Sequence, residues 1–132
     1  MMTINTDEAA IHEAAMDYIE GWFEGNAERM ARCLHPDLAK RSIRYDPDSG
    51  ETRFYQLTKD DMVGYTKEGG GKDVPRDKVY YKVDILDAGK DMAVVRVESF
   101  GYLDHLQLAK DDGQWLIVNV LYTKTATSQE TR

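Results

Sequence analysis

The second half of the chain is a series of strand-like segments separated by turn signals, and this pattern constrains the fold more than any other feature. Apolar and polar residues alternate through residues 79–86, and further strand patterns cover 92–100, 102–110 and 114–124. Asp111-Asp112-Gly113 separates the last two segments, and an Asp-Gly pair suits the positive φ angles of a tight hairpin turn. The pattern therefore predicts a four-stranded antiparallel meander.

The first half of the chain begins with two helical patterns. Apolar residues recur at three- and four-residue spacing through residues 11–23, which places them on one stripe of an amphipathic helix. Gly25 ends this helix, because glycine adopts the left-handed stop without a steric penalty. Asn26 then caps a second, shorter helix, and Pro36 disfavours helical geometry at the residue before it.

A short hairpin and a third helix separate these helices from the meander. The turn signal of residues 46–50 lies between strand-like stretches at 43–45 and 52–57. Thr58 followed by Asp61 resembles a capping box, which starts a helix. The expected order is α-α-β-β-α-β-β-β-β. It predicts an α+β fold, in which a curved antiparallel sheet of about four long strands plus a short hairpin wraps around the N-terminal helices.

Length, charge and cysteine content limit the class of protein. A chain of 132 residues fits a single domain over 1–132, with flexible tails expected at 1–5 and 125–132. The net charge of −7 opposes binding to nucleic acid or to an anionic membrane. Cys33 has no second cysteine to pair with, and we find no signal peptide or membrane-spanning run, so we expect a cytoplasmic location.

Both sides of the last strand pattern are apolar. Trp115, Ile117 and Leu121 alternate with a second apolar set, which consists of Leu116, Val118, Val120 and Tyr122. An antiparallel sheet that covers one core normally leaves its other side polar. The sequence therefore predicts that a second copy of the chain covers the outer sheet face, giving a homodimer.

Two polar residues interrupt these apolar sides. Asp104 shares its side with Tyr102 and Leu106, and Asn119 is expected on the side of Ile117. Buried polar groups need partners or a function, so the pair predicts a polar floor in an apolar pocket. Apolar surroundings disfavour the charged form of a carboxyl group, which would suit Asp104 as a general base. The alternatives are a structural carboxylate for Asp104 and, for Asn119, a bridge to the backbone in place of a ligand contact.

The element order and four segments resemble the nuclear-transport-factor-2-like superfamily, a cystatin-like α+β cone. The segments are residues 18–26, 35–41, 104–108 and 113–119, and they are most similar to its bacterial lumazine-binding-like branch. Ketosteroid isomerase, scytalone dehydratase and polyketide-cyclase-like proteins share the cone. The resemblance implies a pocket between helices and concave sheet, with no metal and no organic cofactor. Because unrelated reactions share this fold, it does not supply a reaction.

The resemblance also changes the interpretation of residues in the first half. Tyr18 and Trp22 lie one helical turn apart and would ordinarily be core, but the cone makes them pocket walls. His35 is either a helix-end histidine with local partners or a ligand-binding residue near the pocket. Lys40 and Arg41 alternate along a strand, so we expect one of them to face the cavity, and Arg41 would offer a planar fork for a carboxylate or enolate.

These observations predict a small-molecule binding protein whose ligand is pterin-like or another aromatic metabolite. The expected ligand-binding residues are Tyr18, Trp22, His35, Arg41, Tyr102 and Asn119. A cofactor-independent isomerase, dehydratase or cyclase with Asp104 as base is the first alternative. A dimeric interaction module with no active pocket is the second. We expect no metal site, because three scattered histidines and one cysteine have no metal-ligand spacing.

Overall fold

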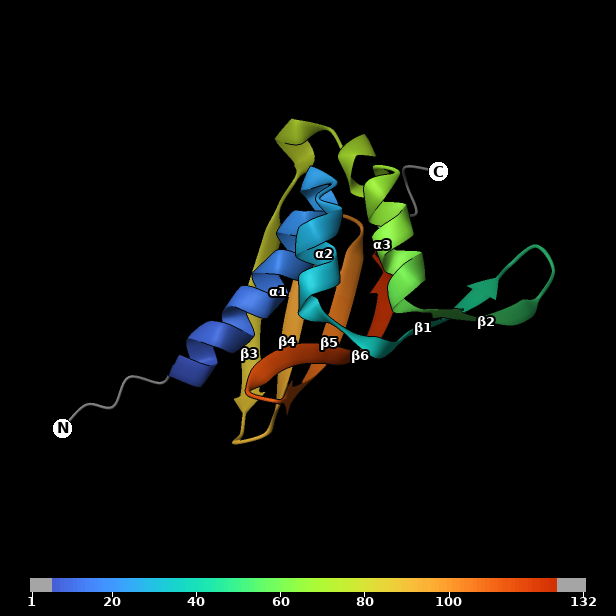
Figure 1. Ribbon diagram of the computed structural model, residues 1–132. Coiled ribbons are helices and arrows are strands. Elements are labelled where there is room, and N and C mark those ends of the chain that lie inside the picture. The colour runs from blue at the N-terminus through green and yellow to red at the C-terminus, as the bar shows by residue number, and fades with distance from the viewer. Residues whose placement is uncertain (1–5, 126–132) are drawn as a thin grey trace.

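The computed structural model describes residues 6–125 and has the predicted α+β fold (Figure 1). Its elements are α1 (Thr6–Glu24), α2 (Ala27–Cys33), β1 (Leu34–Asp46), β2 (Glu51–Leu57), α3 (Lys59–Lys67), two short 3-10 helices (Gly70–Asp73 and Arg76–Lys78), β3 (Tyr81–Ala88), β4 (Met92–Ser99), β5 (Tyr102–Asp111) and β6 (Gln114–Lys124). The tails expected at 1–5 and 125–132 lie, apart from residue 125, outside the described residues.

The strands form one six-stranded sheet in the order β2-β1-β6-β5-β4-β3. Four of the five pairings are antiparallel, but β1 runs parallel to β6. The prediction of a wholly antiparallel sheet was therefore wrong at this pairing. The hairpin of β1 and β2 is also longer than expected, because β1 continues directly from α2 and its first half joins the main sheet. The distal end of this hairpin extends beyond the body of the molecule (Figure 1).

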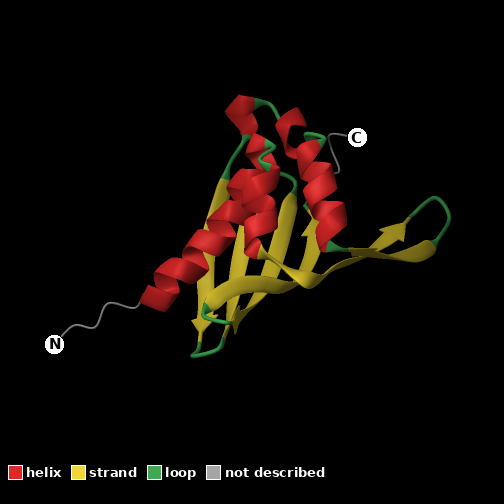
Figure 2. Cartoon of the chain, in the orientation of Figure 1, coloured by secondary structure: helices red, strands yellow, loops and turns green. Residues whose placement is uncertain are grey.

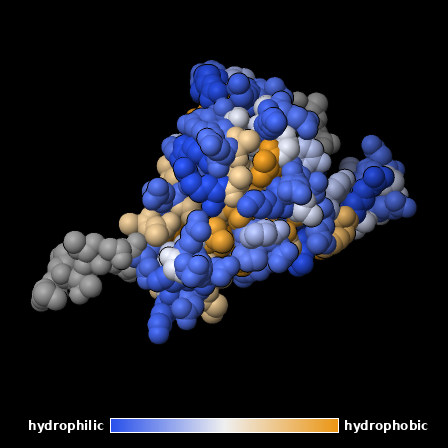
Figure 3. All heavy atoms as spheres, in the orientation of Figure 1, coloured by the Kyte–Doolittle hydropathy of each residue, from blue (hydrophilic) through white to orange (hydrophobic). Residues whose placement is uncertain are grey.

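The three helices cover one face of the sheet (Figure 2). The core lies between α1 and the inner sheet face, and its fully buried side chains include Ile11, Val95, Val97, Leu106, Leu108 and Ile117. On the helix-covered side, the surface is largely hydrophilic, and a few hydrophobic atoms show between the helices (Figure 3). Across the described residues, none of the helices has the length and apolar character that a membrane crossing requires.

Local sequence signals position the helices. The Asn26 side chain accepts a hydrogen bond from the backbone N–H of Arg29 at 3.1 Å and caps α2. Thr58 and Asp61 form the predicted reciprocal capping box at the start of α3. Both caps satisfy backbone donors that a helix start would otherwise leave unpaired.

The glycine-rich segment after α3 packs against α1. Within this segment, Gly70–Asp73 forms a short 3-10 helix. Gly71 is buried, and a Cβ at this position would lie 2.2 Å from the backbone oxygen of Trp22. Glycine is therefore required for the loop to pack this closely against α1.

A β-bulge changes the facing of the last strand. Gln107 pairs with Asn119 while the adjacent Leu108 pairs with Ile117, so β6 holds one extra residue, Val118, between them. The extra residue reverses the alternation. Trp115 and Ile117 face inward before the bulge, and Val120 and Tyr122 face inward after it.

Candidate functional site

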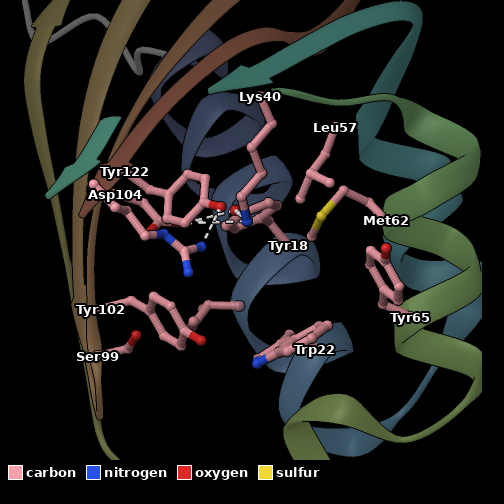
Figure 4. Close-up of a pocket in the computed structure, with 12 residues that line it drawn as sticks. Tyr18, Trp22, Lys40, Leu57, Met62, Tyr65, Ser99, Tyr102, Asp104 and Tyr122 are labelled. Atoms are coloured by element: carbon pink, nitrogen blue, oxygen red, sulfur yellow. Dashed lines mark hydrogen bonds and ion pairs between the residues drawn. The ribbon is translucent and has the colours of Figure 1, made fainter. Parts of the chain in front are cut away.

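A pocket opens between the inner sheet face, α1 and α3 (Figure 4). Its volume is about 170 Å³. The lining residues come from seven elements: Tyr18, Ile19 and Trp22 from α1; Lys40, Arg44 and Leu57 from β1 and β2; Met62 and Tyr65 from α3; and Ser99, Tyr102, Asp104 and Tyr122 from β4, β5 and β6. Residues distant in sequence therefore meet at one cavity.

Three polar side chains form a hydrogen-bonded chain at one end of the pocket. Lys40 Nζ donates to Tyr18 Oη at 2.6 Å, and Tyr18 Oη donates to Asp104 Oδ2 at 2.6 Å. Lys40 Nζ also lies 3.8 Å from the same carboxylate oxygen. All three residues are buried. Hydrogen bonds that involve a charged group are stronger than neutral ones, so this chain fixes the three side chains relative to one another.

Burial and neighbouring charges perturb two of these groups. The pKa of Tyr18 is raised well above 10.0. Burial is the larger cause, and the negative charge of Asp104, which accepts the Tyr18 hydrogen bond, is the second. Burial lowers the pKa of Lys40 below 10.5; Asp104 opposes this change, and the positive charge of Arg44 adds to it. Tyr18 is therefore a neutral donor over the physiological range.

Arg44 approaches the pocket from the hairpin of β1 and β2. Its Nη2 donates to Tyr122 Oη at 2.8 Å, and its guanidinium carbon lies 4.3 Å from the Tyr55 ring centroid and 5.5 Å from that of Tyr122. Lys40 Nζ lies 4.7 Å from the same Tyr122 ring. Two cations therefore flank one aromatic ring, and cation–π contacts hold both in place.

The pocket contains polar atoms with unused hydrogen-bonding capacity. Asp104 Oδ1 and Arg44 Nε are both buried, and neither has a hydrogen-bond partner among the described residues. Such groups are uncommon in native proteins, because an unpaired buried donor or acceptor costs free energy. Both atoms belong to residues that line the pocket, so the side chains around this cavity carry hydrogen-bonding capacity that the described residues leave unused.

The other side of the pocket is apolar and aromatic. Trp22 and Tyr65 face the cavity from α1 and α3, and Met62 and Leu57 lie between them and Lys40 (Figure 4). The turn that holds Gly71 packs on the backbone of Trp22. A ligand held here would contact apolar walls on one side and the polar chain on the other, which is typical of small-molecule sites.

The structure brings together four of the residues that the sequence predicted for the site. Tyr18, Trp22, Tyr102 and Asp104 all line the pocket. Of the adjacent pair on β1, Lys40 faces the cavity. Arg41 is exposed on the outer sheet face, so the expectation that it lines the pocket is corrected.

Asn119 and His35 also lie away from this pocket. The bulge at Val118 turns Asn119 to the outer face, where its Nδ2 donates to Gln107 Oε1 at 3.2 Å. His35 lies at the start of β1, where its Nδ1 accepts from the backbone N–H of Asp37 at 3.0 Å and its Nε2 lies 3.5 Å from Asp111. Asn119 thus bonds a side chain on the neighbouring strand, and not the backbone group that was its alternative. His35 has a local partner, but that partner is a backbone N–H and not a carbonyl.

Sequence reasoning missed four pocket residues with polar groups: Arg44, Tyr65, Ser99 and Tyr122. A signal existed for Arg44. Residues at positions i, i+2 and i+4 of a strand share a face, so placing Lys40 inward also places Arg44 inward. The contribution of Ser99 and Tyr122 depends on pairings between strands that the alternation pattern of one strand does not define.

The described residues include no group of three or more His, Cys, Asp or Glu side chains that could hold a metal ion. Cys33 is a buried free thiol, and burial raises its pKa to about 12. A thiol in this environment holds its proton at neutral pH, which makes it a poor nucleophile.

Comparison with known proteins supports the fold. A family model described as "Putative lumazine-binding" matches residues 6–123. A search of the curated proteins gave no match. Among solved structures, an NTF-2 like protein of unknown function from Silicibacter pomeroyi DSS-3 is 17% identical with a TM-score of 0.74, and the alignment covers 94% of this chain and 100% of that one.

Two further solved structures give the same result. An NTF2-like protein of unknown function from Methylobacillus flagellatus KT is 24% identical, with a TM-score of 0.71 and coverage of 93% and 95%. A ketosteroid isomerase-like protein from Erwinia carotovora atroseptica SCRI1043 is 16% identical, with a TM-score of 0.60 and coverage of 92% and 98%. At these identities the similarity establishes the nuclear-transport-factor-2-like fold alone.

Proposed function

Since the chain belongs to the family described as "Putative lumazine-binding", we propose that its inner pocket binds a compact aromatic metabolite. The observation that carries this proposal is the pair of unpartnered buried atoms, Asp104 Oδ1 and Arg44 Nε, beside apolar walls. A ligand with a donor, an acceptor and a flat apolar body would satisfy both atoms. Tyr18, Trp22 and Tyr102 are the further residues proposed to contact it.

The size of the cavity limits the ligand. Its volume of about 170 Å³ compares with a dry cavity of about 150 Å³ that binds benzene in another protein. Pockets for drug-sized ligands measure roughly 300–1,000 Å³. The closed part of this pocket therefore suits one aromatic ring, and a pterin-like bicycle would extend through the opening.

A thermal-shift screen followed by calorimetry tests the proposal. The panel contains pteridine-diones, flavin precursors, steroid-like compounds and single-ring aromatics. A ligand that binds the native state at tenfold its Kd should raise Tm by about 4 °C. Leu57→Trp fills the cavity and should abolish the shift, whereas Leu86→Trp, at an exposed position of β3, should leave it intact. Binding that survives Leu57→Trp would place the ligand elsewhere and reject the proposal.

A second candidate function is general-base catalysis by Asp104, favoured by the unpartnered Oδ1. This oxygen could accept a proton from a bound carbon acid, while Tyr18 and Lys40 hold the other oxygen in position. Asp104→Asn tests it by NMR with any ligand found in the screen. Exchange of a ligand C–H for deuterium in wild type but not in Asp104→Asn would support the base, and equal rates in both proteins would reject it.

We also propose a homodimer through the outer sheet face. Ile43 and Phe54 are paired across β1 and β2, and Leu121 lies opposite Arg41 on the same side; all three apolar side chains are more than half exposed. An apolar patch of this kind is typical of a protein interface. Light scattering at micromolar concentration should give twice the chain mass, and Phe54→Asp should reduce it. A monomeric wild type would reject the dimer.

The proposed location remains cytoplasmic, because the lone cysteine makes no demand for an oxidising compartment. Fractionation of cells that express the full chain would check it, and recovery of the protein in a secreted fraction would contradict it.

A further inference from the structure

The charged residues of the pocket specify the kind of ligand more narrowly than its shape does. Two cations, Lys40 and Arg44, line the cavity together with a single carboxylate, Asp104. The pocket therefore carries one excess positive charge, in a chain whose net charge is −7. A buried charge without a counter-ion costs desolvation free energy, and a bound group of opposite charge can offset that cost.

The single carboxylate lies closer to one cation than to the other. Asp104 Oδ2 is 3.8 Å from Lys40 Nζ and also accepts from Tyr18. Arg44 has no carboxylate within 4.0 Å among the residues that the structure describes. Its positive charge instead disfavours the charged form of Lys40. Arg44 is thus the cation of this site that lacks an anion.

The guanidinium of Arg44 is also held for binding. The rings of Tyr55 and Tyr122 lie against it, and its Nη2 donates to Tyr122 Oη. These contacts reduce the conformational freedom that Arg44 would lose on binding. Its Nε–H remains buried and without a partner. A planar guanidinium fork matches a carboxylate group, which accepts two parallel hydrogen bonds.

We propose that the pocket binds a small aromatic carboxylate, with the carboxylate on Arg44 and the ring against the apolar walls formed by Ile19, Trp22 and Met62. One negative charge neutralises the excess positive charge of the site. A dianion would instead introduce repulsion from Asp104. This inference rests on the proposed ligand-binding function, and it adds the charge and the chemical group that the site recognises.

Calorimetry with benzoate and its neutral isostere benzamide tests the proposal directly. Hydrogen bonds to charged groups are strong enough for benzoate to bind about 10- to 100-fold more tightly than benzamide at low salt. Arg44→Gln should remove most of this preference by weakening benzoate, with little change for benzamide. Arg53→Gln is the matched control, because Arg53 lies opposite Arg44 on the neighbouring strand and is exposed; it should retain the preference.

Each outcome separates this inference from the proposed function. If benzamide or another neutral aromatic binds as tightly as benzoate, or if Arg44→Gln leaves the preference unchanged, the carboxylate assignment is wrong while the binding pocket stands. If benzoate does not bind, the assignment is also wrong, and the wider screen with Leu57→Trp decides the pocket. Should Arg44→Gln fail to fold, Arg44→Lys replaces it, because lysine keeps the charge but lacks the planar fork. A weaker preference for benzoate in Arg44→Lys than in wild type would then support the carboxylate assignment, and an unchanged preference would reject it.

Discussion

Helix α1 contributes a buried side chain to each of two polar clusters that face different neighbours, and the clusters differ in how fully their atoms are paired. Asp17 faces α2, where its Oδ1 accepts from Arg29 Nε and Arg32 Nη2 at 2.9 and 2.8 Å, and its Oδ2 accepts from Arg32 Nε at 2.9 Å. Its neighbour Tyr18 faces the sheet, where it contacts Lys40 and Asp104. Both carboxylate oxygens of Asp17 are used, whereas Asp104 retains one free oxygen.

The difference suggests separate roles for two clusters of similar composition. A buried carboxylate with all its partners supplied by the protein joins two helices and requires nothing further. A buried carboxylate with an unused oxygen at the wall of a cavity leaves a cost that a ligand can remove. We therefore interpret the Asp17 cluster as structural and the Asp104 cluster as a binding site. The two can be separated by measuring stability and ligand binding in the same variants.

The largest effect on stability is expected at the structural cluster. Asp17→Asn removes three charge-assisted hydrogen bonds and should lower the free energy of unfolding by about 2–3 kcal/mol, with little change in ligand affinity. Denaturant unfolding measures the loss. The matched control is Glu24→Gln, because Glu24 forms a more exposed ion pair with the same Arg29 and should cost no more than about 0.5 kcal/mol. Equal losses for the two variants would contradict the structural interpretation.

The pH dependence of this difference sharpens the same test. Burial alone would raise the pKa of Asp17, but the hydrogen bonds from Arg32 and Arg29 outweigh it and lower this pKa below 3.8. The native state therefore binds fewer protons than the unfolded state near pH 3.8, and stability falls as the pH falls. The difference in free energy of unfolding between wild type and Asp17→Asn should be constant above about pH 5. It should narrow as the pH falls through the lowered pKa of Asp17. A gap that widens in acid would contradict the assignment.

A smaller loss is expected at the pocket, and it should be reversible by a second substitution. Lys40→Met leaves Asp104 buried without its cation. The cost should be about 1–2 kcal/mol, less than for a closely bonded buried pair, because Tyr18 still donates to the carboxylate and the Lys40–Asp104 contact is long at 3.8 Å. Lys40→Met combined with Asp104→Asn removes both charges and should recover most of that loss, since replacing a buried ion pair with neutral residues is often neutral or stabilising. The double variant should still lose affinity for any ligand found in the screen. A double variant that is less stable than either single variant would indicate a structural pair.

The sequence allowed Asp104, Tyr18 and Trp22 to be placed near one another, because each interrupts or extends a regular pattern that fixes its side. It did not allow the same for Asn119. One extra residue reverses the facing of every residue that follows, and nothing in the composition around Val118 marks the bulge. The assignment of Asn119 to the pocket failed for this reason alone.

Arg41 was placed in the pocket instead of Lys40 for a similar reason, an irregularity in strand pairing. The pairing of β1 with β6 shifts between Leu34 and Ala39, so the alternation cannot be extended from the end of α2 into the strand. Arg44 was missed because its role depends on this parity and on the Tyr55 and Tyr122 rings, which come from two other strands. The helix starts, by contrast, were readable, because capping is a local interaction between residues three positions apart.

The smallest expected effect concerns a second polar atom without a partner, next to the pocket. Ser42 lies on β1 between Lys40 and Arg44 and is fully buried, and its Oγ has no partner among the described residues. Unlike Asp104, Ser42 is not among the residues that line the cavity. Ser42→Ala should therefore raise the free energy of unfolding by about 0.5 kcal/mol, because the cost of the unpaired hydroxyl exceeds that of the small void. Ser99→Ala, at the pocket wall, is the control and should give no gain. A loss of stability in Ser42→Ala would show that a bound water pairs with this hydroxyl, and the criterion that separates the two clusters on α1 would then need to count such waters.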